Sequence, residues 1–133
     1  MTYEALKSAR DLLINNSDIT NIVPSTNIQV GWQHEIKNFP SIILYQTGGS
    51  EFGYLGYNTA PSGQKIRREL MNLKVDIISN TSRYQTLQVS DLVTKTMISG
   101  LGARKISDYD DFSDSIKAYL KSLTFMYTVF HED

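Results

Sequence analysis

The apolar alternation of residues 68–79 limits, more than any other feature, how this chain can fold. The segment reads RELMNLKVDIIS, in which Leu73, Val75 and Ile77 alternate with polar residues. Successive side chains of a β-strand point to opposite faces, so this period of two predicts a strand with one apolar face and one wetter face. The apolar face needs a second layer to cover it, because a single sheet cannot bury that face alone.

Three further segments are typical of strands. Residues 27–32 alternate between apolar and polar side chains, and residues 39–46 contain Pro40, which the start of a strand tolerates. The apolar run after Pro40 predicts burial on both faces of the sheet. Residues 116–130 predict a long final strand. The residues expected to share one face of that strand are Leu123, Phe125, Tyr127 and Val129.

Two segments, residues 3–16 and 83–99, have the spacing of amphipathic helices. Residues 80–82 are expected to form a turn and to cap the second helix, and Gly100 and Gly102 are expected to end it. The apolar stripe of the second helix is predicted to contain Leu87, Leu92, Val93 and Met97. A short turn after the first helix is predicted to bring three residues to the core, namely Ile19, Ile22 and Val23.

Residues 47–66 hold five of the eight glycines and interrupt two good strands. They are either one long loop of twenty residues or a glycine-interrupted hairpin that projects from the body. Loops of that length are uncommon inside a compact domain and are usually functional or disordered. Residues 104–112 are likewise compatible with a polar strand or a loop. Their candidate anchors to the core are Ile106, Tyr109 and Phe112.

The order of these segments predicts an α+β fold in a single domain over residues 1–133. We expect one mainly antiparallel sheet of four to five strands with two helices packed on one face, plus the long glycine-rich loop or hairpin. A length of 133 residues is typical of one domain, and neither a repeat nor a linker divides the chain.

Composition excludes several classes of protein. The formal net charge is -1, whereas a constitutive nucleic-acid binder normally has a basic excess. The chain has no cysteine, so it has no disulfide scaffold, thiol nucleophile or cysteine-ligated zinc. The acidic, amphipathic start differs from a secretory signal, and no apolar run is long enough to span a membrane. We therefore expect a soluble, cytoplasmic domain.

No catalytic constellation is visible in the sequence. The two histidines, His34 and His131, have no convergent partners, and the G-x-S-x-G pattern of hydrolases is missing. The glycine pairs lack the G-K-[ST] ending of phosphate-binding loops, and the aspartates of residues 108–114 lack the glycine and distal glutamate of a calcium loop. We therefore expect no enzyme activity, no metal and no cofactor.

Aromatic and basic residues gather in and just after residues 47–66. Such a mixture can bind single-stranded nucleic acid, but tyrosine and arginine are also enriched at protein interfaces. The net charge of -1 favours the protein interface over nucleic-acid binding. The aspartates near residue 110 are either a solvated turn or a charged contact with a neighbouring subunit. The candidate interface residues are Phe52, Tyr54, Tyr57, Lys65, Arg67, Arg68, Asp108, Asp110 and Asp111.

The segment order, together with the Phe39-Pro40 pair that precedes the apolar strand Ile42 to Tyr45, resembles the tail terminator proteins of long-tailed bacteriophages, also called tail completion or tail-to-head joining proteins. The resemblance extends over nearly the whole chain. It implies a small α/β fold and a homo-hexameric ring that caps the completed tail tube, stops its polymerisation and presents a surface to the head connector. It also implies a non-enzymatic virion protein of the head-tail junction, assembled in the host cytoplasm, with DNA only passing through the lumen.

Two other interpretations remain open. One is another phage neck component, such as a head-closure protein, and the other is a non-viral small oligomeric binding module. In a closed ring each subunit offers two different patches. The acidic residues 108–114 and the basic residues 65–68 are candidates for such complementary patches.

Overall fold

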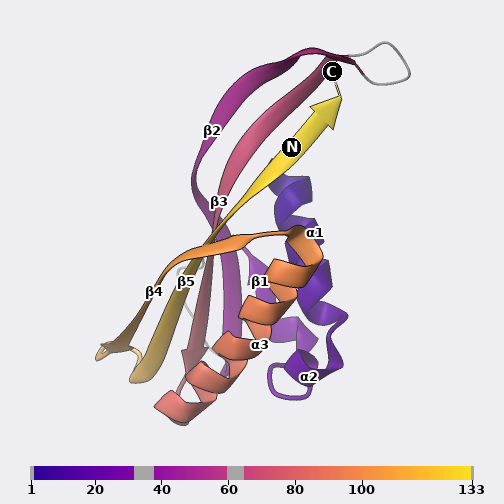
Figure 1. Ribbon diagram of the computed structural model, residues 1–133. Coiled ribbons are helices and arrows are strands. Elements are labelled where there is room, and N and C mark those ends of the chain that lie inside the picture. Colours follow the sequence, from indigo (N-terminus) through magenta and orange to yellow (C-terminus); the bar gives the residue numbers. More distant parts are fainter. Residues whose placement is uncertain (1, 32–37, 60–64, 133) are drawn as a thin grey trace.

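The computed structural model describes residues 2–31, 38–59 and 65–132 (Figure 1). Its helices are α1 (Thr2–Ile14), α2 (Ser17–Thr20) and α3 (Arg83–Leu101), with a short 3-10 turn at Ser25–Asn27. Its strands are β1 (Ile28–Val30), β2 (Ser41–Thr59), β3 (Lys65–Ser79), β4 (Arg104–Ser113) and β5 (Ala118–Glu132).

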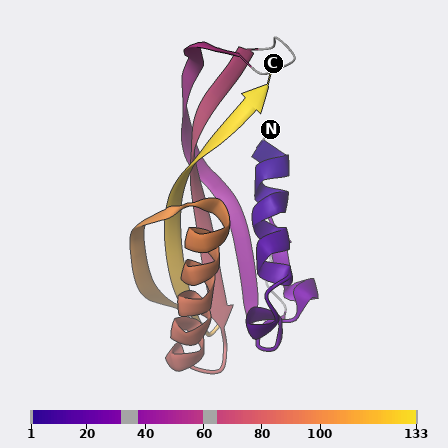
Figure 2. The same cartoon turned by 45° about the vertical axis from the view of Figure 1, so that its right-hand side comes forward.

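The strands form one five-stranded sheet in the order β1-β2-β3-β5-β4. Strand β1 runs parallel to β2, and the other three pairs are antiparallel. Helices α1 and α3 lie side by side on one face of this sheet in both views (Figures 1 and 2). The mainly antiparallel α+β fold with two helices on one face is therefore confirmed, with the short α2 as an addition.

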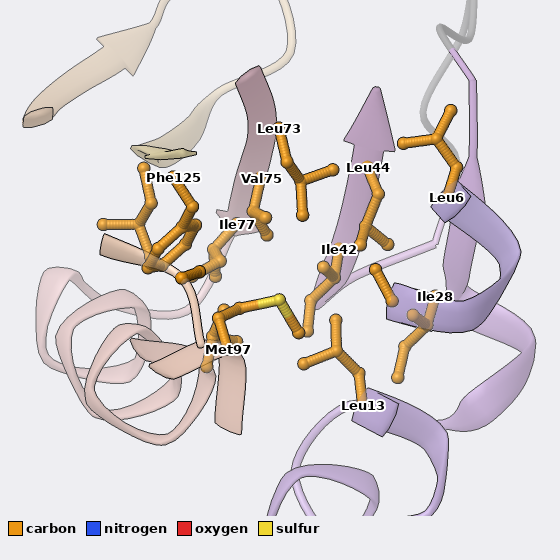
Figure 3. Packing of buried hydrophobic residues seen from close by; sticks show 14 of the residues in the cluster. Leu6, Leu13, Ile28, Ile42, Leu44, Leu73, Val75, Ile77, Met97 and Phe125 are labelled. Carbon is orange, nitrogen blue, oxygen red and sulfur yellow. The ribbon is translucent and has the colours of Figure 1, made fainter. Parts of the chain in front are cut away.

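The main core lies between the helices and the sheet (Figure 3). Leu6 and Leu13 of α1 and Met97 of α3 point toward the apolar faces of the strands. The alternation of residues 68–79 is confirmed, because Leu73, Val75 and Ile77 are all fully buried in this core. Burial of each such side chain contributes about 1.5–3 kcal/mol, so the covered face is the main source of stability.

The two other apolar strands also behave as their patterns predict. On β5, Leu123, Phe125 and Tyr127 are buried in the main core, and Val129 packs against it. On β2, Ile42 and Leu44 face the helices. The intervening residue is buried on the opposite face in a second cluster, which comprises Ile43, Ile78 and Ala118. Burial on both faces of this strand is therefore confirmed.

The ends of α3 follow the expected capping pattern. Ser82 accepts a hydrogen bond from the backbone N–H of Gln85, and Gly102 ends the helix with a φ of 63°, which favours glycine. The predicted stripe was partly wrong, because Leu87 is 41% exposed. The buried residues of α3 are Thr86, Val89, Ser90, Val93 and Met97. Two inner positions are thus small hydroxyl residues, which an apolar pattern cannot detect.

Residues 47–59 and 65–66 belong to strands, so the hairpin alternative describes them and the twenty-residue loop does not; residues 60–64 lie outside the described residues. Strand β2 pairs antiparallel with β3 as far as Thr59 and Lys65. Register shifts fall between Gln46 and Gly48, between Glu51 and Gly53, and between Tyr54 and Thr59. Glycine inside a strand commonly marks such irregularities, which explains why a glycine-rich segment is still a strand. The far ends of β2, β3 and β5 extend beyond the helical layer (Figure 1).

Residues 104–113 form strand β4. The interpretation of residues 108–114 as an acidic turn was therefore wrong for residues 108–113. The expected anchors were also wrong, since Ile106, Tyr109 and Phe112 are all exposed. The reason is the position of the strand: β4 is at the edge of the sheet and has β5 as its one neighbouring strand among the described residues.

Candidate functional site

Strand β4, at the edge of the sheet, is the most exposed helix or strand in the described part of the chain. Nine of its ten residues are exposed. Ile106, Tyr109 and Phe112 are 44%, 50% and 41% exposed, which is unusual for large apolar side chains so close together on one strand. Tyr109 and Phe112 are three positions apart and therefore lie on opposite faces of the strand, so the exposed apolar groups are spread along the edge and do not form one patch. An edge strand with exposed apolar side chains is nevertheless a candidate interaction surface.

Ion pairs within the chain neutralise much of the acidic stretch. The Lys105 ammonium lies 2.7 Å from the Asp108 carboxylate, and the largely buried Lys121 lies 3.4 Å from both Asp108 and Asp110. The hydrogen bond from Lys105 holds the pKa of Asp108 below its usual value, helped by the positive charges of Lys105 and Lys121. Among the described residues, only Asp111 and Asp114 of this stretch make no ion pair.

Arg83 holds the β4–β5 hairpin against the start of α3. Its guanidinium donates to the backbone carbonyls of Leu120 at 3.0 Å and of Asp111 at 2.8 Å. It also pairs with the Asp110 carboxylate at 3.2 Å and lies 5.1 Å from the centre of the Tyr119 ring. Sequence reasoning missed this residue, because its partners are 27 or more positions away and no local pattern marks them.

A polar network crosses the face of the sheet that the helices do not cover. The buried Asp76 carboxylate accepts hydrogen bonds from the Tyr45 hydroxyl at 2.9 Å and from the Ser122 hydroxyl at 2.7 Å. The ammonium of Lys74 lies 5.8 Å from the Tyr45 ring and 5.7 Å from the Tyr109 ring, which ties the edge strand to the middle of the sheet.

The hydrogen bonds of this network stabilise the fold and do not activate a reactive group. Burial raises the pKa of Tyr45, and the charge of Asp76 together with its hydrogen bond raises it further. The phenol therefore stays protonated and donates to Asp76, which leaves no activated nucleophile there. Sequence reasoning placed Asp76 on the wetter face of its strand, but the side chain is only 5% exposed. Nothing in the local pattern indicates the hydroxyl groups that replace water around it.

The remaining predicted interface residues come together on the β2–β3 hairpin. Phe52, Tyr54 and Tyr57 are on β2, and Lys65, Arg67 and Arg68 are on β3. In the backbone register Tyr54 is opposite Arg67. The side chains of these six residues lie outside the part of the chain whose side chains are described.

The acidic and basic stretches are far apart within one chain. Along β5, Asp111 pairs with Leu120 whereas Arg67 pairs with His131. At ~3.3 Å per residue, these positions are roughly 36 Å apart along the strand. Any contact between the two stretches must therefore join different copies of the chain.

Two surface depressions in the described part of the chain are candidate ligand sites. One, of about 360 Å³, lies beside α1 and β1 and contains Arg10, which already donates to the Ile28 carbonyl at 2.7 Å. The other, of about 300 Å³, is lined by residues of α3 alone, including Tyr84 and Leu87. Both are open to solvent, and neither gathers convergent polar groups of the kind that fix a small ligand.

The described residues offer neither a metal site nor a membrane-spanning helix. Over the described ranges no group of three or more potential metal-ligating side chains comes together. His34 and the side chain of His131 lie outside those ranges. None of the helices in the described part of the chain is both long and apolar enough to cross a bilayer.

Comparison with known proteins links the chain to a fold. Its sequence matches no protein-family profile and no curated protein. Its structure is similar to a chain in the virion of a native gene transfer agent (GTA) particle, with a TM-score of 0.69. The likeness covers 95% of this chain and 94% of the other at 7% sequence identity. At that identity the likeness shows a shared fold, and it extends over nearly the whole of both chains.

Proposed function

We propose that this chain is a structural component of a phage-like virion. The observation that supports this most is the likeness to a chain of a gene transfer agent virion over nearly the full length of both chains. A match at 95% and 94% coverage compares nearly the whole of both chains and not a shared fragment. The exposed β4 edge fits a role in assembly, because structural virion proteins act through their contacts.

Within the virion, we propose that the chain is a tail terminator. Six copies form a ring that caps the completed tail tube, stops its polymerisation and offers an attachment surface to the head connector. The support is the segment order of such proteins together with the virion neighbour. In this role the chain is not an enzyme, and DNA only passes through the lumen. A net charge of -1 suits passage of DNA, since affinity for phosphate grows with each Lys or Arg contact.

The test is assembly with purified partners. We expect light scattering after size exclusion, together with negative-stain images, to give a six-fold ring, either alone or on addition of tail tubes. We also expect the chain to bind the ends of tubes assembled from the tube protein of the same virion and to stop their growth. Binding to the portal or its adaptor, with no effect on tubes, would instead favour a head-closure protein. Binding to neither would favour a non-viral oligomeric module.

A further inference from the structure

The two longest open edges of the sheet in the described part of the chain belong to β4 and to the far end of β2, and a shorter one is Tyr127–Glu132 of β5, beyond the end of β4. Strand β4 is the last strand of the order and pairs only with β5. At the other side, the short β1 pairs with β2 only from Ile42 to Leu44. Over Gly48–Tyr54 and at Thr59, β2 therefore has β3 as its one described partner, and residues 55–58 form an irregularity between them. The two longest open edges lie on opposite sides of the sheet, and at its opposite ends (Figure 1).

Strand β1 is a poor candidate for pairing with another copy. It has only three residues, and the Ile28 carbonyl already accepts a hydrogen bond from the Arg10 guanidinium. The two long edges are different, because each offers a row of backbone N–H and C=O groups. An exposed edge of this kind is a template for pairing with another strand unless the protein blocks it.

We propose that the open edge of β4 pairs with the open edge of β2, over Gly48–Thr59, in a second copy of this chain. The sheet then continues from one subunit into the next. The inference rests on the proposed ring and names the contact between its subunits. Because the two edges belong to different sides of the sheet, the contact is head-to-tail, as a closed ring requires.

Charge complementarity favours β2 of a second copy as the partner of β4. Asp111 and Asp114 are the carboxylates of the acidic stretch that make no ion pair among the described residues. The strand next to β2 in the second copy carries Lys65, Arg67 and Arg68. A pairing of β4 with β4 of another copy would instead bring two acidic stretches together, which is unfavourable for strands that face each other.

Cysteine cross-linking tests the contact directly, because the natural chain has no cysteine. We would combine Ser107→Cys on β4 with either Ser50→Cys or Asn58→Cys on β2, two positions that sample different registers. Under oxidation, at least one pair should give a ladder of covalent oligomers. A mixture of the two single variants should stop at covalent dimers, since each chain then has one reactive edge.

The matched control combines Ser50→Cys with Ser8→Cys, an exposed position on α1, and should give no ladder. Dimers of the single variant Ser107→Cys would indicate β4–β4 pairing and overturn the proposal. Oligomers that form without any cross-link between β2 and β4 would overturn it as well, as would a chain that stays monomeric even on tail tubes.

An edge-blocking variant gives an independent measurement. Ile106→Lys places a charge on the open edge, and because Ile106 is 44% exposed the variant should fold with an unchanged melting temperature. We expect it to be monomeric by light scattering. Ile98→Lys, at a 49% exposed position on α3, is the matched control and should assemble normally.

These outcomes separate the inference from the proposed function. Rings with the β2–β4 cross-link that do not cap tail tubes would support the inference and contradict the tail terminator role. Rings that cap tubes but assemble equally well with Ile106→Lys would support the role and contradict the edge contact.

Discussion

Tyr127 combines a buried aromatic ring with a hydroxyl that has no hydrogen-bond partner among the described residues. The side chain is 6% exposed on β5. Burial, and after it the negative charge of Glu69, raise the pKa of Tyr127 to about 12. The ring therefore stabilises the core, while the hydroxyl carries a desolvation cost that nothing described offsets.

This residue gives the first prediction. Tyr127→Phe should leave the free energy of unfolding at pH 7 unchanged or raise it by up to about 1 kcal/mol, because a buried unsatisfied hydroxyl is removed. The measurement is urea denaturation of both proteins at neutral pH. A loss of more than about 1 kcal/mol would mean that the hydroxyl has a partner after all.

The same residue predicts a pH dependence. In the unfolded chain tyrosine ionises near pH 10, whereas the folded protein keeps this proton until about pH 12. The stabilisation is fully present below pH 10 and is lost as the pH rises through the folded value. Tyr127→Phe should therefore show a smaller loss of stability between pH 10 and 12 than the natural chain. Tyr84→Phe, at a 74% exposed position, should match the natural chain.

At the scale of elements, the β4–β5 hairpin depends on α3. Arg83 provides that link through two carbonyls, one carboxylate and one aromatic ring. An arginine suits this position because its planar guanidinium presents several donors at fixed angles, whereas a lysine offers a single ammonium. The edge strand is thus fixed in position although almost all of its side chains are exposed.

Arg83→Ala should lower the free energy of unfolding by roughly 2–3 kcal/mol, since charged hydrogen bonds to backbone carbonyls are lost. Arg83→Lys should recover only part of this loss. Arg104→Ala, an exposed arginine on β4, is the control and should change stability by less than about 0.5 kcal/mol. Chemical denaturation measures all three. Equal effects at the two arginines would show that general charge, and not this geometry, stabilises the hairpin.

The helix and strand assignments show where local patterns suffice. Residues 68–79 and 116–130 were predicted correctly as strands, because alternation of apolar residues is a local property of the chain. The stripe of α3 was harder, since Thr86 and Ser90 are buried there in place of apolar residues. The buried hydroxyl of Thr86 is satisfied because it donates a hydrogen bond to the Arg83 carbonyl at 2.7 Å. A pattern of apolar residues does not reveal such a bond.

At the scale of the whole molecule, the proposed assembly depends on the opposite ends of one sheet. In the proposed assembly, the basic residues of β3 in one copy face the aspartates near the end of β4 in another, since the two stretches lie far apart within one chain. Attraction between exposed charges weakens with salt, because the Debye length falls to about 3 Å at 1 M ionic strength. Oligomer stability should therefore decrease as salt increases, while the backbone pairing persists.

Reversal of these charges gives the last prediction. Arg67→Glu with Arg68→Glu should weaken the oligomer by at least about tenfold at low salt, as measured by sedimentation or light scattering over a concentration series. Addition of Asp111→Lys and Asp114→Lys to this double variant should restore assembly. Asp91→Lys on α3 is the control and should not restore it. Assembly that is unchanged by the first pair at every salt concentration would exclude this charge pairing.

Much of the candidate surface could be named from the sequence, but its arrangement could not. Aromatic and basic residues in and after residues 47–66 were visible as a composition, and the structure brings their positions onto one hairpin. The aspartates were visible too, yet the pairing of Asp108 and Asp110 with Lys121 depends on strands β4 and β5 being neighbours.

The sequence by itself determined the two long helices and the strands over residues 39–46, 68–79 and 116–130, because these depend on periodicities of a few residues. It left residues 47–66 and 104–112 undecided between strand and loop. Only the tertiary structure decided which strands are at the edges, which aspartates are neutralised and which tyrosine is buried with no hydrogen-bond partner among the described residues. Those properties arise from contacts between residues far apart in the chain, such as Ser122 with Asp76. The order of strands in a sheet is set by the packing of the whole chain, and that order leaves β4 open for another copy.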